Sequence, residues 1–197
     1  MIVLAEILSF LFNPAVFFFI MPYFIVYRQT GNNISAVKWE LFSFAFLFIG
    51  LLLVLLGKHK KLISDIDLSN REQRAKFYLI LWLLAFSYLF AAIFFRGLFF
   101  DLSVISLGIA FGIILFTFVN MYIKASVHVA VACAFVITIA VLYGQNGLLT
   151  TIWIIPLVSW ARIILKRHTI VEITLGGLLG AAITFLTFLI RRYIILY

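Results

Sequence analysis

The chain is poor in charge and contains a single cysteine. Lys, Arg, Asp and Glu make up 11% of its 197 residues, whereas 66% of the residues are hydrophobic and the mean hydropathy is +1.23. A water-soluble fold of this length needs a larger polar surface, so that class is excluded and the lipid bilayer must be the solvent. The lone Cys133 excludes an intramolecular disulfide and does not indicate a redox compartment.

Alternation of apolar and polar residues, the pattern of a transmembrane β-barrel strand, is also lacking. The apolar runs instead continue over the roughly 18 to 20 residues that a helix needs to cross the hydrocarbon core. We therefore expect an all-α, polytopic bundle of about six to seven transmembrane helices, in a single domain over residues 1–197. Seven windows have this length and composition, at residues 3–27, 39–56, 77–95, 103–123, 126–144, 148–165 and 170–190.

The first window lacks a basic segment and a small-residue cleavage site, so we expect a retained transmembrane span and not a signal peptide. Pro14 and Pro22 fall within this window and Pro156 within the sixth, and each can kink its helix. Gly144 and Gly147 predict a turn between the fifth and sixth windows. The chain is thus expected to be an integral multi-pass protein of the cell membrane.

The net charge of +8 comes from cations in short loops beside the predicted spans. Basic residues in such places set the orientation of a membrane protein or meet lipid phosphates, so nucleic acid is not an expected partner. Three polar segments, residues 57–76, 124–128 and 162–168, are each separated from the next by two crossings. We therefore expect all three on one membrane face, as one composite site. The basic residues divide too evenly between the two faces to show which face is cytoplasmic.

Two of the three histidines, His128 and His168, lie at the ends of predicted spans, where an ionisable group is costly and a functional site is the default hypothesis. In the simpler alternative, each hydrogen-bonds only a lipid headgroup or a neighbouring helix. His59 lies among lysines and is interpreted as a solvated residue. With Glu172, the two span-end histidines could also form a two-His-one-carboxylate metal site. The surrounding cations argue against it, because they repel a divalent ion.

Those cations fit an anion instead. The guanidinium of Arg162 and the ammonium of Lys124 are groups that bind phosphoryl oxygens, the first of them bidentately. Ser126 stands where it could cap the next helix, whose first amides would add donors for the same anion. Lys166 and Arg167 suit anchors for lipid headgroups. A phosphate-sized site with two histidines calls for nucleophilic and acid–base roles.

The spacing Arg162-x5-His168-x3-Glu172, preceded by Lys124-Ala-Ser-Val-His128, resembles the motifs of the type 2 phosphatidic acid phosphatase (PAP2) superfamily. The family's motifs read K-x6-R-P, P-S-G-H and S-R-x5-H-x3-D. Their order, their helix placement and their expected common face agree with this chain. The third motif is the most specific part of the likeness, because its spacing is kept throughout.

The likeness covers the chain from about residue 57 to residue 177, with departures at several motif positions. Ala125, Val127 and Ala161 stand where the family has proline, glycine and serine, and a glutamate replaces the aspartate of the third motif. No K-x6-R-P occurs. Arg71 and Arg74 are the best candidates for the cations of that first motif.

The resemblance implies a lipid phosphatase that needs no metal or other cofactor. His168 would attack phosphorus and become a phosphohistidine, Glu172 would hold the other ring nitrogen, and His128 would protonate the leaving oxygen and then help to activate water. The substrate would be a phosphomonoester or diphosphate lipid, such as phosphatidate, phosphatidylglycerophosphate or a polyprenyl diphosphate. The residues implied in binding the phosphoryl oxygens are Arg162, Lys124, Ser126 and either Arg71 or Arg74.

Two alternatives to a hydrolase remain open. Degenerate motifs also fit a catalytically silent relative that binds or moves anionic lipids. They fit equally a phosphotransferase that passes the phosphoryl group to an acceptor other than water. The histidine pair favours turnover, because a protein that only binds lipid does not need it.

The start of the last window also has structural interpretations. Thr169-Ile-Val-Glu172 matches the S/T-x-x-E capping box, in which the carboxylate would turn to the Thr169 backbone and away from the neighbouring histidine. Gly176, Gly177 and Gly180 have the small-residue spacing that suits close packing of one membrane helix on another.

Overall fold

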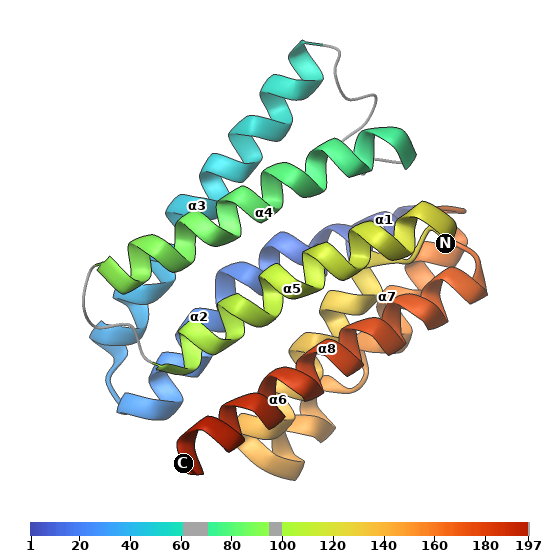
Figure 1. Cartoon of the computed structure of the whole chain (residues 1–197). Helices are drawn as coiled ribbons and strands as arrows, with labels where there is room; N and C mark the ends of the chain where they lie inside the picture. The colour runs from blue at the N-terminus through green and yellow to red at the C-terminus, as the bar shows by residue number, and fades with distance from the viewer. Residues whose placement is uncertain (61–70, 95–99, 197) are drawn as a thin grey trace.

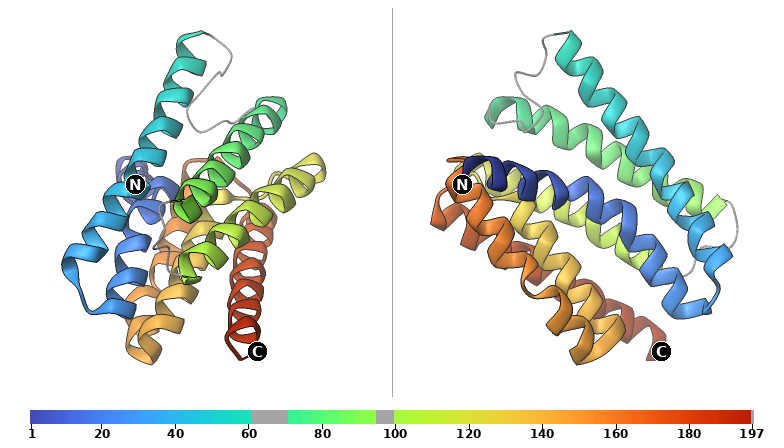
Figure 2. Two further views of the ribbon diagram at one scale, coloured as in Figure 1. Left: turned by 60° about the vertical axis from the view of Figure 1, so that its left-hand side comes forward. Right: turned by 180° about the vertical axis from the view of Figure 1, so that it is seen from behind.

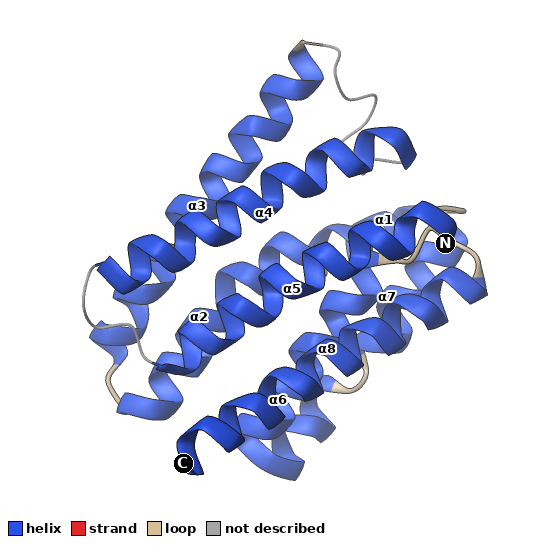
Figure 3. Cartoon of the chain, in the orientation of Figure 1, coloured by secondary structure: helices blue, strands red, loops and turns tan. Residues whose placement is uncertain are grey.

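The structure is a computed structural model that describes residues 1–60, 71–94 and 100–196 (Figure 1). These residues form helices joined by short turns, and no strand occurs among them (Figure 3). The predicted all-α class is confirmed. The helices are α1 (Ile2–Leu11), α2 (Pro14–Thr30), α3 (Asn33–His59), α4 (Arg71–Phe94), α5 (Phe100–Tyr122), α6 (Val127–Thr151), α7 (Ile154–Ile164) and α8 (Ile170–Leu196).

Five stretches of the described chain are long and apolar enough to cross a membrane, which supports a polytopic membrane protein. They match five of the seven predicted windows. The two remaining windows contain shorter apolar helices, Leu79–Ala91 within α4 and Ile154–Ile164. The five candidate spans are Ile2–Thr30, Asn33–His59, Val104–Tyr122, Val127–Thr151 and Ile170–Tyr193.

The first candidate span is divided into α1 and α2 at Phe12 and Asn13. Asn13 is the N-cap of α2, and its side-chain oxygen accepts a hydrogen bond from the Ala15 amide at 2.9 Å. Pro14 follows as the first helical residue, a position at which the missing N–H of proline has no cost. Pro14 therefore begins a new helix, whereas Pro22 lies buried inside α2.

Gly144 reverses the direction of the chain inside α6. Its φ of 68° and ψ of −152° belong to a region that glycine enters far more readily than any other residue. The returning arm continues through αR dihedrals at Ile152 and Trp153 into α7. An irregular turn precedes Pro156, because proline has no N–H to donate to the Ile152 carbonyl. The predicted turn near Gly144 is confirmed, and α6 packs against α7 as well as α8 (Figure 1).

The tightest helix contact joins α6 and α8, as the glycine spacing predicts. A Cβ placed on Gly176 would lie 2.9 Å from the Ser126 nitrogen, closer than real Cβ atoms approach. Gly180 meets the backbone of Ala130 in the same way. The absence of side chains at these two glycines lets the first half of α8 lie directly on the beginning of α6.

The buried core lies around α6, where it joins α2, α7 and α8. α3 packs on α2, and α4 packs on α5. α3 and α4 therefore lie at the side of the bundle (Figure 2). The main core cluster consists of Phe17, Val129, Ala132, Cys133, Phe135, Val136, Ile139, Val158 and Ile173.

Candidate active site

Four helix ends meet at one end of the bundle: the end of α5, the start of α6, the end of α7 and the start of α8 (Figure 1). α1 lies at the same end and packs on α7. The predicted polar segments at residues 124–128 and 162–168 therefore lie together. The remaining predicted segment, residues 57–76, begins at the end of α3 and continues into the start of α4. These two helix ends point toward the same end of the molecule (Figure 2).

A closed turn at the end of α7 accounts for the spacing between Arg162 and His168. The Lys166 amide donates to the Ile163 carbonyl at 2.9 Å, and the Arg167 amide donates to the Arg162 carbonyl at 3.1 Å. These are the two hydrogen bonds of a Schellman motif, with Lys166 in the left-handed conformation at φ 52°. The His168 amide also points to the Arg162 carbonyl, at 3.4 Å. The turn thus brings the histidine back beside the helix that carries the arginine.

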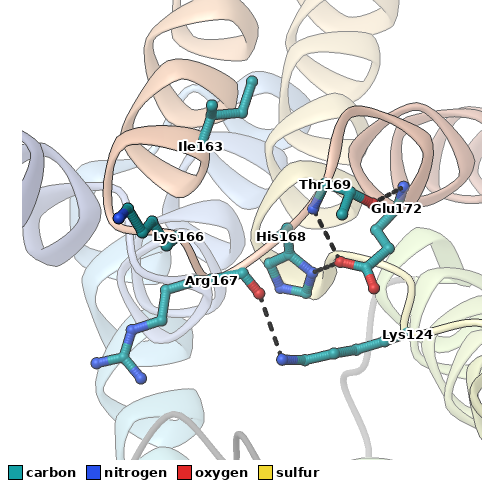
Figure 4. Close-up of a pocket in the computed structure, with 7 residues that line it drawn as sticks. All are labelled: Lys124, Ile163, Lys166, Arg167, His168, Thr169 and Glu172. Atoms are coloured by element: carbon teal, nitrogen blue, oxygen red, sulfur yellow. Dashed lines mark hydrogen bonds and ion pairs between the residues drawn. The ribbon is translucent and has the colours of Figure 1, made fainter.

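His168 and Glu172 are in contact across the start of α8 (Figure 4). The His168 Nδ1 atom lies 3.1 Å from Glu172 Oε2, and the two side chains are 3% and 20% exposed. The Thr169 amide donates to the same carboxylate oxygen at 3.0 Å, and the Glu172 amide donates to Thr169 Oγ1 at 3.4 Å. The capping box is therefore present, but the expectation that it would turn the carboxylate away from the histidine is wrong. One oxygen accepts both bonds, because Thr169 is the residue that follows His168.

The imidazole of His168 is neutral at pH 7. Burial, and then the charge of Arg162, lower the pKa of His168 from 6.5 to about 4, and Lys124 lowers it further, against the opposing effect of Glu172. Because an ionised carboxylate only accepts hydrogen bonds, Nδ1 carries the ring proton in its contact with Glu172. Nε2 then keeps a lone pair, which is the state a nucleophile needs.

An open hollow of about 420 Å³ lies beside this pair. Lys124 runs past His168, and its Nζ donates to the Arg167 carbonyl at 3.3 Å (Figure 4). The exposed side chains of Lys166 and Arg167 extend away from His168 in this view. The hollow is lined by Lys124, Ile163, Lys166, Arg167, His168, Thr169 and Glu172.

Ser126 occupies the N-cap position of α6, as expected, but its side chain does not cap the helix. Its amide donates to the Glu172 carbonyl at 3.0 Å, which ties the start of α6 to the first turn of α8. The residue is fully buried, and its hydroxyl has no hydrogen-bond partner among the described residues. The predicted cap is wrong because this backbone tie and the neighbouring α8 set the orientation of Ser126.

Arg162 is buried, at 3% exposure, and its Nη1 donates to Ser9 Oγ of α1 at 2.9 Å. Sequence reasoning missed Ser9, whose only signal is a serine within an apolar run. His128 is the second residue of α6 and is half-buried. The residues that line the hollow include neither Arg162 nor His128.

Arg71 and Arg74, the candidates for the first motif, lie in the first turn of α4. Their side chains lie outside the described part of the structure.

The alternative metal site is not assembled. Among the described side chains, no three His, Cys, Asp or Glu residues lie close enough together to hold a metal ion. His128, His168 and Glu172, the set considered from the sequence, all belong to that part of the chain.

No family model, curated protein or solved structure matches the chain. A functional proposal therefore depends on the motif spacing and on the geometry of the site.

Proposed function

We propose that the protein is a membrane lipid phosphatase that acts through a phosphohistidine on His168. One observation carries the proposal: a buried, neutral imidazole is held through Nδ1 by Glu172 at the edge of a hollow that Lys124 also lines. A histidine arranged in this way has its Nε2 lone pair ready for attack on phosphorus. The chain's long apolar helices support a membrane protein, in which such a site would meet lipid.

The reaction is a double displacement at phosphorus. His168 Nε2 attacks, a P–N bond forms, and the P–O bond to the lipid breaks. The leaving oxygen takes a proton from protonated His128. Water then attacks the phosphohistidine while His128 takes a proton from it, the P–N bond breaks, and inorganic phosphate leaves. Glu172 stabilises the positive charge that His168 carries in the intermediate.

The cations supply the electrostatic part of catalysis. Arg162 and Lys124 both act on the charge state of His168, which supports their assignment as ligands of the phosphoryl oxygens. The Ser126 hydroxyl and the first amides of α6 add neutral donors. Either Arg71 or Arg74 completes the set in this proposal. The scheme uses no metal or other cofactor.

The substrate is a lipid whose phosphate reaches the end of the bundle while its tail stays in the hydrocarbon. Phosphatidate, phosphatidylglycerophosphate and a polyprenyl diphosphate all meet this description. Exposed Lys166 and Arg167 at the site end favour an anionic membrane surface around the headgroup. We place the protein in the cell membrane.

A second candidate is a catalytically silent protein that binds or moves anionic lipids. The observation that favours it is the absence of His128 from the residues lining the hollow, since a phosphatase needs a proton donor at the leaving oxygen. A phosphotransferase of the same chemistry would show turnover only with an acceptor other than water.

Phosphate release from the purified protein in detergent, with a chelator present, tests the proposal. The substrates are a short-chain phosphatidate, a phosphatidylglycerophosphate and a prenyl diphosphate. We expect turnover of at least one, and loss of roughly 10³-fold or more in kcat for His168→Ala. His59→Ala, at the exposed end of α3, is the matched control and retains the rate.

Silence of the wild type on all three lipids, with His168→Ala indistinguishable from it, would refute the hydrolase and leave the lipid-binding candidate. Turnover that appears only when an alcohol acceptor is added identifies the phosphotransferase.

A further inference from the structure

A polar side-chain contact joins α1 to the site end of the bundle. Arg162 Nη1 donates to Ser9 Oγ at 2.9 Å, although the two residues are 153 positions apart in the chain. Arg162 is 3% exposed and Ser9 is 9% exposed, so this hydrogen bond is shielded from solvent. A buried guanidinium is costly unless its donors are satisfied, which gives such a contact more weight than a surface bond.

The partner of the Ser9 hydroxyl is unusual for this protein. Hydroxyls within the apolar helices generally donate to the carbonyl one turn earlier, as Ser43 does to Trp39 and Thr184 does to Gly180. The Ser9 oxygen instead accepts from a side chain on α7. A local, purely helical role therefore does not account for Ser9.

The contact fixes the direction of a charge that acts on the candidate nucleophile. The backbone of Arg162 accepts hydrogen bonds from the turn that carries His168, and its charge disfavours protonation of the imidazole. Because the guanidinium is planar, holding Nη1 fixes the directions of all its N–H donors. The serine on α1 thus contributes to the orientation of the whole fork.

We propose that Ser9 is a positioning residue, whose hydroxyl orients the Arg162 guanidinium for the phosphoryl group and makes α1 one wall of the site. This inference rests on the proposed function, in which Arg162 binds phosphoryl oxygens. It assigns α1 a role in phosphate recognition as well as in membrane insertion.

Binding of inorganic phosphate provides a test that does not depend on turnover. The affinity is read from the rise in the unfolding midpoint of the full-length protein with phosphate concentration. We expect Ser9→Ala to weaken phosphate binding by about tenfold or more, the loss of a hydrogen bond to a charged group. Ser9→Thr keeps the hydroxyl and is expected to recover most of the affinity.

Ser43→Ala is the matched control, because Ser43 is a similarly buried serine on α3, a helix that packs on α2 and α4, and its side-chain partner is Tyr88. It should bind phosphate as the wild type does. In an Arg162→Ala background, Ser9→Ala should cause no further loss, since its effect passes through the arginine. Ser9→Cys, in which a weakly hydrogen-bonding thiol replaces the hydroxyl, replaces Ser9→Ala if the alanine variant does not fold.

Unchanged phosphate affinity in both Ser9→Ala and Ser9→Cys would overturn the inference. So would an equal loss of phosphate affinity from Ser9→Ala in the wild-type and Arg162→Ala backgrounds. A wild type that binds phosphate but hydrolyses no lipid refutes the proposed hydrolase alone, and Ser9 is then judged by its phosphate affinity. A wild type that does not bind phosphate and does not turn over lipid refutes both.

Discussion

The pair α6 and α8 and the helix α3 are built from equally apolar sequence but are packed differently. The most apolar 18-residue windows of α6 and α3 have mean hydropathies of 2.3 and 2.4, yet 44% of the α6 window is buried and only 11% of the α3 window. Hydropathy therefore does not decide which membrane helix becomes core. Residue size does, because Gly176 and Gly180 let α8 approach the α6 backbone, whereas α3 presents leucine and phenylalanine outward.

The difference explains why the candidate chemistry lies on the α6–α8 side. A catalytic pair has to be held within a fraction of an ångström, and close backbone packing supplies that restraint. Ser126 is tied to Glu172 at the place where Gly176 brings the two helices together. We expect substitutions on this side to change activity or stability strongly, and matched substitutions on α3 to change them little.

The largest contrast is expected between two carboxylates. In the proposed mechanism, Glu172→Gln removes the charge that stabilises the phosphohistidine, so kcat should fall on the order of 10³-fold while the protein stays folded. Glu40→Gln on α3 should keep the wild-type rate of phosphate release. Equal rates for Glu172→Gln and the wild type would remove the carboxylate from the mechanism.

The pH dependence of stability should also come from the site side. The pKa of His168 is about 4 in the folded protein and 6.5 as its ordinary value, so between these values the unfolded chain binds more protons. The free energy of unfolding therefore falls as pH drops from 6.5 toward 4, by roughly 3 kcal/mol at most. Phosphate release should fall only as the pH approaches 4, because the imidazole of the folded protein stays neutral above that value and a protonated imidazole cannot attack.

Unfolding of His168→Asn as a function of pH checks this prediction. The variant should lose the fall in the free energy of unfolding between pH 6.5 and 4 that His168 causes. The exposed His59 on α3 provides the control His59→Asn, which should keep it. An unchanged slope in His168→Asn would contradict the assignment.

Two glycine-to-alanine substitutions test the packing directly. Gly180→Ala forces a methyl group against the Ala130 backbone, which cannot move aside, so the protein should lose about 2 to 3 kcal/mol. On α3, a Cβ at Gly50 would lie 3.4 Å from the mobile end of Leu84, and Gly50→Ala should change stability by less than about 1 kcal/mol. Unfolding midpoints in detergent measure both. Similar losses at the two positions would show that α3 is packed as tightly as α8.

Two helix caps separate stability from activity. Thr169→Ala removes a side-chain acceptor from the box that holds Glu172, and Asn32→Ala removes the N-cap of α3, which accepts from two amides. Each should cost about 1 kcal/mol of stability. Only Thr169→Ala should also lower kcat, by several-fold, because the Glu172 amide loses its acceptor and the first turn of α8, which carries the carboxylate beside His168, is held less firmly. Equal kcat values in the two variants would show that the box has no part in catalysis.

The smallest effect is expected at Lys166, whose left-handed backbone favours glycine. Lys166→Gly should be neutral or stabilise the protein by less than about 1 kcal/mol. It should also leave kcat unchanged, because the lysine side chain extends away from His168 (Figure 4). A clear loss of phosphate release would instead assign the ammonium to the substrate.

Much of the fold was predictable from the lengths of the apolar runs. The division between α1 and α2 was visible as Asn13-Pro14, but a window average over residues 3–27 conceals a break of two residues. α7 is shorter than its predicted window because Pro156 has no N–H for the Ile152 carbonyl, so a turn at Ile152 and Trp153 interrupts the helical window.

The contact of His168 with Glu172 was predictable because it depends only on one helical turn, and the approach of Lys124 was predictable because the span count puts both polar segments at the same end of the helices. Ser9 was not predictable, since its role depends on the packing of α1 against α7. The double use of Glu172 Oε2 was also beyond the sequence pattern. The two hydrogen bonds to this oxygen depend on the angle at which the chain enters α8, which a sequence pattern does not give.

The reversal at Gly144 joins two helical arms that pack side by side, one leading back to Ser126 and the other on to Arg162, with the bend at one end and the two tips at the other. The register of the tips is therefore set by arm length. One residue inserted between Gly144 and Arg162 would swing the guanidinium by about 100° around the helix axis and raise it by about 1.5 Å. A change of length in this segment can preserve the site only in whole turns.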